Sequence, residues 1–278
     1  MPRSSYSATS RICEWIVASA DQTVHIPGTL KSESWKQVLQ ALSNRRRLPM
    51  CEGSYWGRVI EKNDEIWIWS FWTEQDAYEQ HTKSELYQDL LVSLTAFSDV
   101  PPRVSLLELE GRRMYSVIGL KYGLPSVLLA FFDTALTKDK RDDLRRVKDM
   151  RSPYNIIGPS NAPPLNWASR GYLSPDPYNA CDGLYVIIDW WSAGREEEVR
   201  RIEVPVPGAH PPQKITLDES RTKELRNIGC TEIILRHLHF NYVGEISDTD
   251  FCLRGRHRIS ETALPDRSAS NSFPDLKK

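Results

Sequence analysis

The sequence has few cysteines, and they form no recognisable motif. Five are spread over 278 residues without a C-x-x-C pair, at positions 13, 51, 181, 230 and 252. This spacing argues against a disulfide framework or a thiolate zinc site, and it is typical of a reducing compartment. Long apolar runs are also missing: the first 15 residues hold none of secretory length, and no 18 consecutive residues are apolar. We therefore expect a soluble cytoplasmic protein that does not bind a membrane.

Excess charge and nucleotide-binding loops are absent as well. The 36 basic and 37 acidic residues give a net charge of −1, so no global field attracts nucleic acid. We expect the basic clusters Arg45 to Arg47 and Arg254 to Arg258 to be solvated surface. There is no G-x-G-x-x-G after a strand, no Walker loop and no recognisable Ser-His-Asp context. The sequence thus predicts no cofactor.

Tryptophan, in contrast, is abundant, with nine residues. Several lie in the stretch from Asp64 to Tyr87, where the run IWIWSFW alternates as a strand over 66–72. Thr73 is the expected N-cap of a helix that follows at once. Because bulky apolar groups occupy both faces of this strand, both faces must be covered.

The first half of the chain reads as β-α-β-β-α-β. A strand at 12–19 precedes a helix that ends near Arg47 and begins with a capping box of Ser34 and Gln37. Strands at 55–61 and 66–72 form a hairpin with a turn at 62–64, the next helix breaks near Lys83 and Ser84, and a last strand spans 104–110. This is the ferredoxin-like order.

The second half repeats that order, with strands at 127–133, 167–173, 184–191 and 230–243 and helices at 137–150, 193–202 and 218–228. Trp72 aligns with Trp191 at an offset of 119 residues, which indicates an internal duplication. We therefore expect an N-terminal repeat over 11–111 and a C-terminal repeat over 112–258, flanked by disordered ends at 1–10 and 259–278.

The duplication predicts an α+β fold. A sheet with helices on one face leaves the other face bare, and two ferredoxin-like repeats can bury both bare faces by closing an eight-stranded barrel within one chain. We expect a cavity between the sheets and a monomer that is a pseudo-dimer, or a weak homodimer.

The first repeat also resembles a known superfamily. The segment YWGRVIEKNDEIWIWSFWTEQDAYEQH, followed by Ser84 and Tyr87 as S-x-x-Y, is similar to the antibiotic-biosynthesis-monooxygenase branch of the dimeric α+β barrels, over about residues 11 to 110. The resemblance implies an intramolecular dimeric α+β barrel. That superfamily includes cofactor-free monooxygenases, heme-degrading enzymes, aldol-type cyclases and isomerases. The heme-degrading members use an asparagine in their first strand, and the strand ICEWIVAS has none.

His81 is the first candidate for chemistry. The resemblance implies that a histidine here projects toward the mouth of the barrel, where it would act as a general acid or base. The alternative is a histidine that packs between helix and sheet without chemistry. Its counterpart in the second repeat is Arg200.

The aromatic residues are candidates for substrate binding, although simple core packing accounts for most of them. Periodicity cannot decide which face of strand 66–72 looks into the barrel. The candidate residues are Tyr55, Trp56, Trp67, Trp69, Trp72, Tyr87 and Trp191.

Polar residues inside apolar strands complete the candidates. Glu14 and Asp189 are either buried acids with partners or surface-facing residues, and Arg58 is a possible partner for either one or for an anionic substrate. His237 and His239 share a strand face, but no spacing supplies a third ligand, so we expect no metal. They line the cavity or lie exposed.

The leading hypothesis is a cofactor-free tailoring enzyme that cyclises or isomerises a hydrophobic polyketide- or terpenoid-like molecule, with His81, Asp189 and Arg58 in catalytic roles. One alternative is a cofactor-free monooxygenase that acts on a phenol or an anthrone. Another is a carrier that binds its ligand without changing it.

Overall fold

Sixteen helices and strands make up the described chain. The computed structural model describes residues 11–20, 30–45, 47–48, 50–110, 125–147, 165–174, 183–191, 196–206 and 208–243. The first half contains β1 (Arg11–Ser19), α1 (Leu30–Arg45), β2 (Cys51–Val59), β3 (Lys62–Trp72), α2 (Gln75–Thr82), α3 (Glu85–Phe97) and β4 (Arg103–Glu110). The second half contains β5 (Pro125–Phe132), α4 (Lys138–Arg146), β6 (Leu165–Ser174), β7 (Gly183–Trp191), α5 (Glu196–Arg200), β8 (Glu203–Pro205), β9 (Lys214–Thr216), α6 (Leu217–Asn227) and β10 (Glu232–Tyr242).

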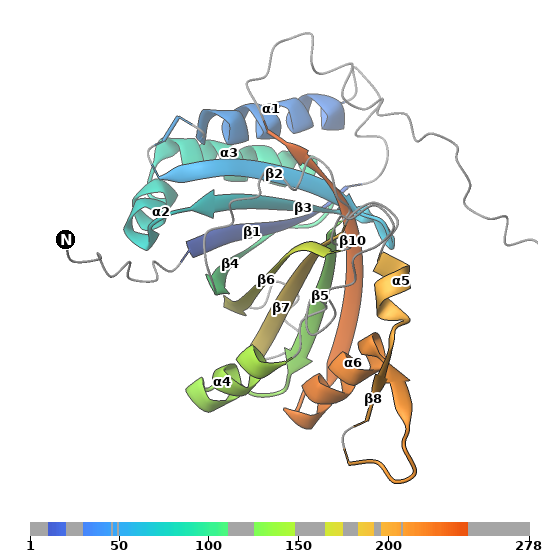
Figure 1. The fold of residues 1–278 in the computed structure, drawn as a ribbon. Helices are drawn as coiled ribbons and strands as arrows, with labels where there is room; N and C mark the ends of the chain where they lie inside the picture. Colours follow the sequence, from blue (N-terminus) through green and yellow to red (C-terminus); the bar gives the residue numbers. More distant parts are fainter. Residues whose placement is uncertain are drawn as a thin grey trace, which may run out of the picture. The chain divides into compact units, whose positions relative to one another are not determined.

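Eight of these strands close one barrel, in the order β1-β3-β2-β10-β5-β7-β6-β4 (Figure 1). Within each half the order is that of a ferredoxin-like sheet, and the halves join where β2 pairs with β10 and β4 with β6. At the second junction the backbones approach closely. A Cβ on Gly171 would lie 2.6 Å from the Glu108 carbonyl oxygen, so a larger residue does not fit without a shift. The predicted fold class is confirmed.

The side chains that point into the barrel form a packed core. The indoles of Trp15, Trp67 and Trp69 meet with ring centroids 4.5 to 6.2 Å apart, and aliphatic side chains from the second half complete the cluster. The expected cavity between the sheets is therefore occupied by these rings, because alternate residues of facing strands converge there. Trp67, Trp69 and Phe71 form the inner face of β3. The sequence alone could not decide which face of this strand points into the barrel.

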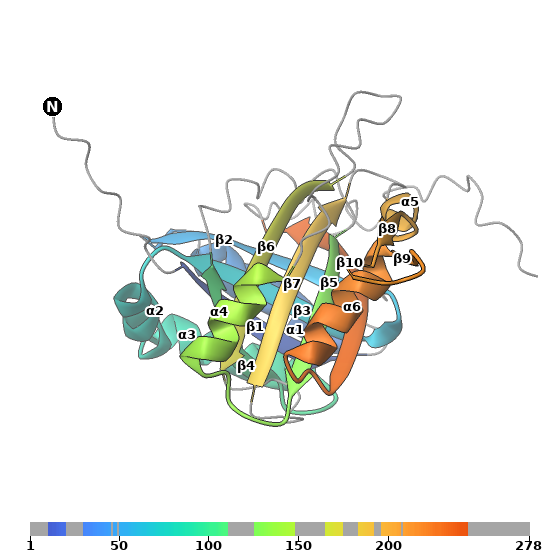
Figure 2. The same ribbon diagram turned by 60° about the horizontal axis from the view of Figure 1, so that its bottom comes forward.

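The helices cover the outer face of the barrel. α1 and α3 pack on the β1–β4 half through a cluster that includes Trp35, Val38 and Ile68, and α4 and α6 pack on the other half through Leu144 and Leu225 (Figures 1 and 2). Outward-facing side chains of the strands thus lie between sheet and helices. None of the helices described is long and apolar enough to cross a membrane.

Several predicted boundaries were wrong. α1 begins at Leu30, so Ser34 lies inside the helix rather than at its N-cap. Thr73 does not cap α2, because the N-cap of this helix is Glu74. Instead, the amide and the hydroxyl of Thr73 donate to the Met50 carbonyl, at 2.9 and 3.4 Å. The β2–β3 turn lies at 60–61, and the β8–β9 hairpin was not predicted.

The predicted break between α2 and α3 is confirmed, since α2 ends at Thr82 and α3 begins at Glu85. The termini expected to be disordered, 1–10 and 259–278, lie outside the described residues.

Candidate functional site

Each half of the barrel places a carboxylate opposite a serine on its outer face. Glu14 on β1 pairs in register with Ser70 on β3, and Ser126 on β5 pairs in register with Asp189 on β7. At the 119-residue offset, Ser70 on β3 corresponds to Asp189 on β7. The first half therefore carries its carboxylate on its first strand and its serine on its third, whereas the second half carries the serine on its first strand and the carboxylate on its third. All four residues are buried. Each carboxylate needs a cationic partner from the helices above it, because an isolated buried charge is costly.

In the first half that partner is Arg45, at the end of α1. Its guanidinium forms an ion pair with Glu14 and donates to Ser70 Oγ at 3.2 Å, and both charged side chains are 0% exposed. The expectation that Arg45 is solvated surface was wrong, since α1 turns this residue toward the sheet along with Leu42. Glu14 is a buried acid with a partner, one of the two possibilities left open for it.

An aromatic group lies beside this ion pair. Trp72 points outward from the end of β3 and stacks on His81 of α2, with centroids 5.0 Å apart and planes at 29°. Tyr87 of α3 meets the edge of His81 at 5.4 Å, and the Arg45 guanidinium lies 5.4 Å from the centre of the Tyr87 ring. We call the set the N-terminal cluster; it comprises Glu14, Arg45, Ser70, Trp72, Tyr78, His81, Ser84 and Tyr87.

The hydrogen bonds of His81 indicate its tautomer. Ser84 Oγ lies 2.6 Å from the His81 carbonyl oxygen and 3.2 Å from His81 Nδ1. The single hydroxyl hydrogen goes to the nearer carbonyl, so Nδ1 carries the proton and donates to Ser84. Nε2 is then left with a lone pair, and it is buried without a hydrogen-bond partner in the described structure.

Burial also keeps this ring neutral. Loss of solvent, assisted by the positive charge of Arg45, lowers the pKa of His81 to about 4. The imidazole is therefore an uncharged base at neutral pH. Burial and the negative charge of Glu14 raise the pKa values of Tyr78 and Tyr87. Both phenols thus stay protonated beside a basic nitrogen.

Ser84 connects the α3 cap to His81, and its removal has a defined cost. Its hydroxyl accepts from the Tyr87 amide at 3.3 Å as the N-cap of α3. Ser84→Ala should destabilise the protein by about 0.5–2 kcal/mol in urea unfolding, the usual cost of a lost N-cap. Ser93→Ala on the same helix, where the hydroxyl bonds only the Asp89 carbonyl, is the control and should change stability by less than about 0.5 kcal/mol. Equal effects of the two substitutions would contradict the capping role.

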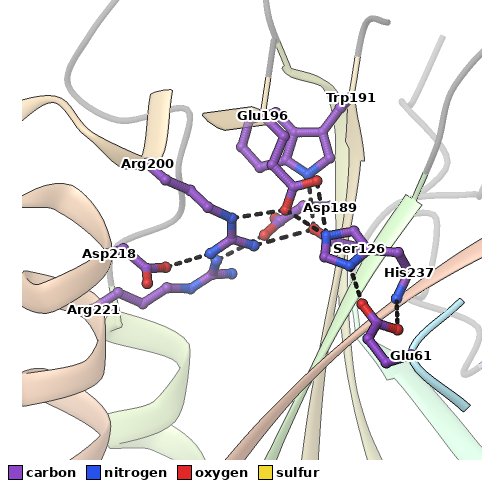
Figure 3. Close-up of polar contacts among 9 residues, drawn as sticks. All are labelled: Glu61, Ser126, Asp189, Trp191, Glu196, Arg200, Asp218, Arg221 and His237. Atoms are coloured by element: carbon purple, nitrogen blue, oxygen red, sulfur yellow. Dashed lines mark hydrogen bonds and ion pairs between the residues drawn. The ribbon is translucent and has the colours of Figure 1, made fainter. Parts of the chain in front are cut away.

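The second half carries a larger polar network, shown in Figure 3. Asp189 pairs with Arg221 of α6 at 2.7 Å, and both side chains are 1% exposed. Trp191 donates from Nε1 to Ser126 Oγ at 2.7 Å, and Arg200 Nη2 donates to the same oxygen at 3.3 Å. We call this set the C-terminal cluster; it comprises Glu61, Ser126, Asp189, Trp191, Glu196, Arg200, Asp218, Arg221 and His237.

His237 lies at the edge of that cluster between two carboxylates. Its Nδ1 contacts Glu61 in the β2–β3 turn, and its Nε2 lies 3.1 Å from Glu196 of α5. The hydrogen bond to Glu196 raises the pKa of His237, Glu61 acts in the same direction, and burial opposes both. The contact ties the first repeat to the second.

Substitution of His237 should therefore change how stability depends on pH. A raised pKa gives stabilisation that is complete below the ordinary value of about 6.5 and is lost as pH rises through the folded-state pKa. The thermal midpoint of His237→Gln should fall further below that of the parent at about pH 6 than at about pH 9. His210→Gln, at an exposed histidine, is the control. A constant difference across this range would count against the charged bridge.

Comparison with known proteins identifies the fold. No protein-family profile matches the sequence, and no curated protein matches it. Among solved structures, an anthrone oxidase-like protein aligns with 84% of this chain and 94% of its own at 11% identity, with a TM-score of 0.52. A candidate monooxygenase from Fusobacterium nucleatum subsp. nucleatum aligns with 85% and 94% at 8% identity, with a TM-score of 0.50. The chain folds as a dimeric α+β barrel closed within one polypeptide.

The fused barrel separates the predicted site residues into three places. Tyr55, Trp67 and Trp69 lie inside the barrel. Glu14, Trp72, His81 and Tyr87 meet in the N-terminal cluster, and Asp189, Trp191 and His237 belong to the C-terminal cluster.

Three further candidates lie elsewhere. Trp56 faces outward against Trp35 of α1, with centroids 4.9 Å apart. Arg58 pairs with neither Glu14 nor Asp189, because its guanidinium donates to the backbone carbonyls of Ala20 and Asn63. The backbone of His239 pairs with that of Arg58, and the His239 side chain lies outside the described part of the structure.

Other places on the fused barrel are weaker candidates. Among the residues described, no group of three His, Cys, Asp or Glu side chains is arranged to hold a metal ion. A surface groove of about 320 Å³ runs between α1 and α3, but Asp89 is the only ionisable residue that lines it. The N-terminal cluster is the place where a free base and aromatic walls coincide.

The sequence reasoning missed Arg45, Tyr78, Glu61, Glu196 and Arg221. Two of these left a signal. Arg45 continues the apolar stripe of Val38 and Leu42, and Arg221 lies between Leu217 and Leu225 at four-residue steps. A charged residue on an apolar stripe indicates a buried ion pair.

Proposed function

We propose that the chain is a cofactor-free enzyme that removes a proton from a small aromatic carbonyl compound of the anthrone class and lets the resulting carbanion react with oxygen. The observation that carries the proposal is the stacked pair of Trp72 and His81. Trp72 Nε1 is a buried donor and His81 Nε2 a buried acceptor, and neither has a hydrogen-bond partner in the described structure. Such a pair suits a planar substrate with an acidic proton and a carbonyl oxygen.

The reaction can be written in balanced form. His81 Nε2 takes one proton from the methylene group, and the carbanion adds to O2 to give a peroxide that regains this proton. Loss of the second methylene hydrogen with cleavage of the O–O bond then leaves a ketone and water. One oxygen atom enters the product and one enters water, so no other oxidant is required.

The surroundings of His81 support this role. The neutral ring, with its pKa lowered to about 4, is a base throughout the physiological range. Trp72, Tyr78 and Tyr87 supply flat walls. The unpartnered Nε1–H of Trp72 is the donor that can stabilise negative charge on the substrate oxygen. The name of the anthrone oxidase-like protein that shares this fold agrees with such a substrate.

Substrate access requires a movement of α2. His81 and Tyr78 are only 4% and 6% exposed, so the cluster is closed in this structure. α2 has eight residues and no side-chain bond at its N-cap. This helix is the element whose displacement opens the cluster, and movements of this kind are common at active sites.

A second reaction suits the same groups. The carbanion formed by His81 can attack a carbonyl within the substrate instead of oxygen, with Trp72 Nε1 donating to the oxyanion that develops. This is the aldol-type cyclisation or isomerisation of a polyketide-like chain that the sequence suggested first, and the unpaired donor beside the base supports it as well.

Oxygen uptake tests the proposal. The purified protein is incubated with a hydroxylated anthrone, and oxygen consumption is followed together with quinone absorbance, after subtraction of uncatalysed oxidation. We expect one O2 consumed per quinone formed, with the rate lost in His81→Gln and kept in His210→Gln. Ring closure of an aromatic polyketone without oxygen uptake would favour the cyclase, and tight binding of the anthrone without turnover would favour a carrier. Absence of both binding and turnover would contradict the proposed site.

A further inference from the structure

Helix α2 is held to the rest of the protein mainly by two of its side chains. Only Tyr78 and His81 are buried among its eight residues, and both rings pack on Trp72 of β3, with centroids 5.8 and 5.0 Å away. An isolated helix of this length is not stable in water. Figures 1 and 2 show α2 at the margin of the fold, next to α3. The helix therefore depends on these two side chains, and loss of their contacts releases it as a unit.

The chain on either side of α2 is fixed by bonds that do not involve the helix. Before it, the Thr73 amide donates to the Met50 carbonyl at 2.9 Å, and the Thr73 hydroxyl lies 3.1 Å from Met50 Sδ. Met50 has a φ of 73°, a conformation that a residue other than glycine keeps only where its surroundings hold it. After the helix, Ser84 caps α3 by accepting from the Tyr87 amide. Residues 74–83 thus form a segment with two anchored ends.

A hydrogen-bond chain runs from α2 to the buried ion pair of the first half. Tyr78 bonds Tyr87 of α3, and Tyr87 bonds Glu14 of β1. Because the Glu14 carboxylate, paired with Arg45, can only accept a hydrogen bond, Tyr87 uses its single hydrogen on Glu14. Tyr78 is therefore the donor to the Tyr87 oxygen. Since Tyr78 is the only member of this chain that α2 carries, its bond to Tyr87 is the one that breaks when α2 moves.

We infer that residues 74–83 are a lid over the N-terminal cluster, latched by the hydrogen bond from Tyr78 to Tyr87. The lid pivots on the residues that anchor its ends, Thr73 and Ser84. It opens locally, while α3 and the barrel strands stay folded. Lids of this kind admit a substrate and then exclude water from the site.

Opening of the lid uncovers one side of the proposed substrate site. The His81 ring leaves the face of Trp72, whose Nε1–H has no partner in the described structure. The base moves out with α2 and returns when the lid closes. This use of the lid rests on the proposed function, whereas the movement itself can be measured without a substrate.

Amide hydrogen exchange of the full-length protein, followed by mass spectrometry of its peptides, tests the lid. In the parent, residues 75–82 should exchange faster than residues 85–97, with little dependence on urea below the unfolding transition, because a local opening exposes little surface. Tyr78→Phe removes only the latch hydroxyl and should raise the exchange rate of 75–82 by about two- to tenfold, the change in equilibrium that one hydrogen bond sustains. Tyr172→Phe removes a hydroxyl that donates to the Arg141 carbonyl of α4 at 3.1 Å and should leave this rate unchanged.

Two results would overturn the inference. One is exchange of α2 and α3 at the same rate with the same dependence on urea, since the two helices would then open together. The other is a Tyr78→Phe variant in which α2 exchanges at the parent rate. The first comparison uses the parent alone, so it decides the case in which Tyr78→Phe does not fold. Neither measurement involves a substrate, and a lid that opens in a protein without anthrone turnover would contradict the proposed reaction but not the movement.

Discussion

His81→Gln is expected to lower kcat/KM for an oxidisable anthrone by about 10²- to 10⁴-fold, the usual contribution of a positioned general base. Glutamine keeps a polar group of similar length, but its amide nitrogen and oxygen are far less basic than the free Nε2 of His81. The pKa of His81 is lowered to about 4, so this base is already unprotonated above about pH 5. Titration of His81 should therefore cause no change in the kcat/KM of the parent above that pH. Steady-state oxygen uptake measured across pH tests both statements.

Two variants control for indirect effects of His81→Gln. His210→Gln makes the same exchange at an exposed histidine and should leave kcat/KM at the parent value. Trp69→Phe alters the packed interior of the barrel and should lower stability while turnover per folded molecule persists. If Trp69→Phe abolished turnover and His81→Gln did not, the reaction would belong inside the barrel rather than between β3 and the helices.

Arg45→Met is expected to destabilise the protein by about 3–5 kcal/mol, the range found when one partner of a buried ion pair is removed. Glu14 and Arg45 are both 0% exposed, so the remaining carboxylate would be left without a cation in a site closed to water. The loss is measured as a shift of the guanidinium chloride unfolding midpoint at constant slope.

Removal of both charges separates the ion pair from the size of the side chains. Glu14→Leu combined with Arg45→Met should recover most of the lost stability, because replacement of a whole buried pair by apolar residues is often close to neutral. Arg47→Met, at an exposed arginine two residues away, should change stability by less than about 0.5 kcal/mol. A single Arg45→Met variant as stable as the parent would show that Glu14 has another partner or is not charged.

The architecture could be predicted from the sequence because it depends on patterns that survive divergence. Alternation in the Trp-rich strand, the match of Trp72 with Trp191 and the element order of both halves were enough to give two ferredoxin-like repeats and their closure into a barrel. The helix starts were less accurate. Thr73 satisfies the usual preference for an N-cap, but it forms hydrogen bonds to Met50 across the sheet edge instead, and no local pattern reports a contact 23 residues away.

The site could be predicted only in part. Periodicity placed Trp69 and Trp72 on opposite faces of β3, but it could not say which face the helices cover. Consequently the interior was expected to hold the reaction, although its rings pack together, and the outer face holds the free base. Arg45 and Arg221 lie on apolar helix stripes and were detectable in principle. The contacts of His237 with Glu61 and Glu196 join residues from three separate elements, and only the closed barrel brings them together.

Nitrogen-15 NMR of the histidine rings tests most directly whether His81 is a neutral base with a free Nε2. Labelled parent protein is titrated from about pH 8 to about pH 5, a range in which an ordinary histidine gains its proton, and the His81 signals are assigned by their absence in His81→Gln. The structure predicts a neutral ring throughout, with the proton on Nδ1 and an unprotonated Nε2. A midpoint near the ordinary value of about 6.5, or a proton on Nε2 at neutral pH, would contradict the account.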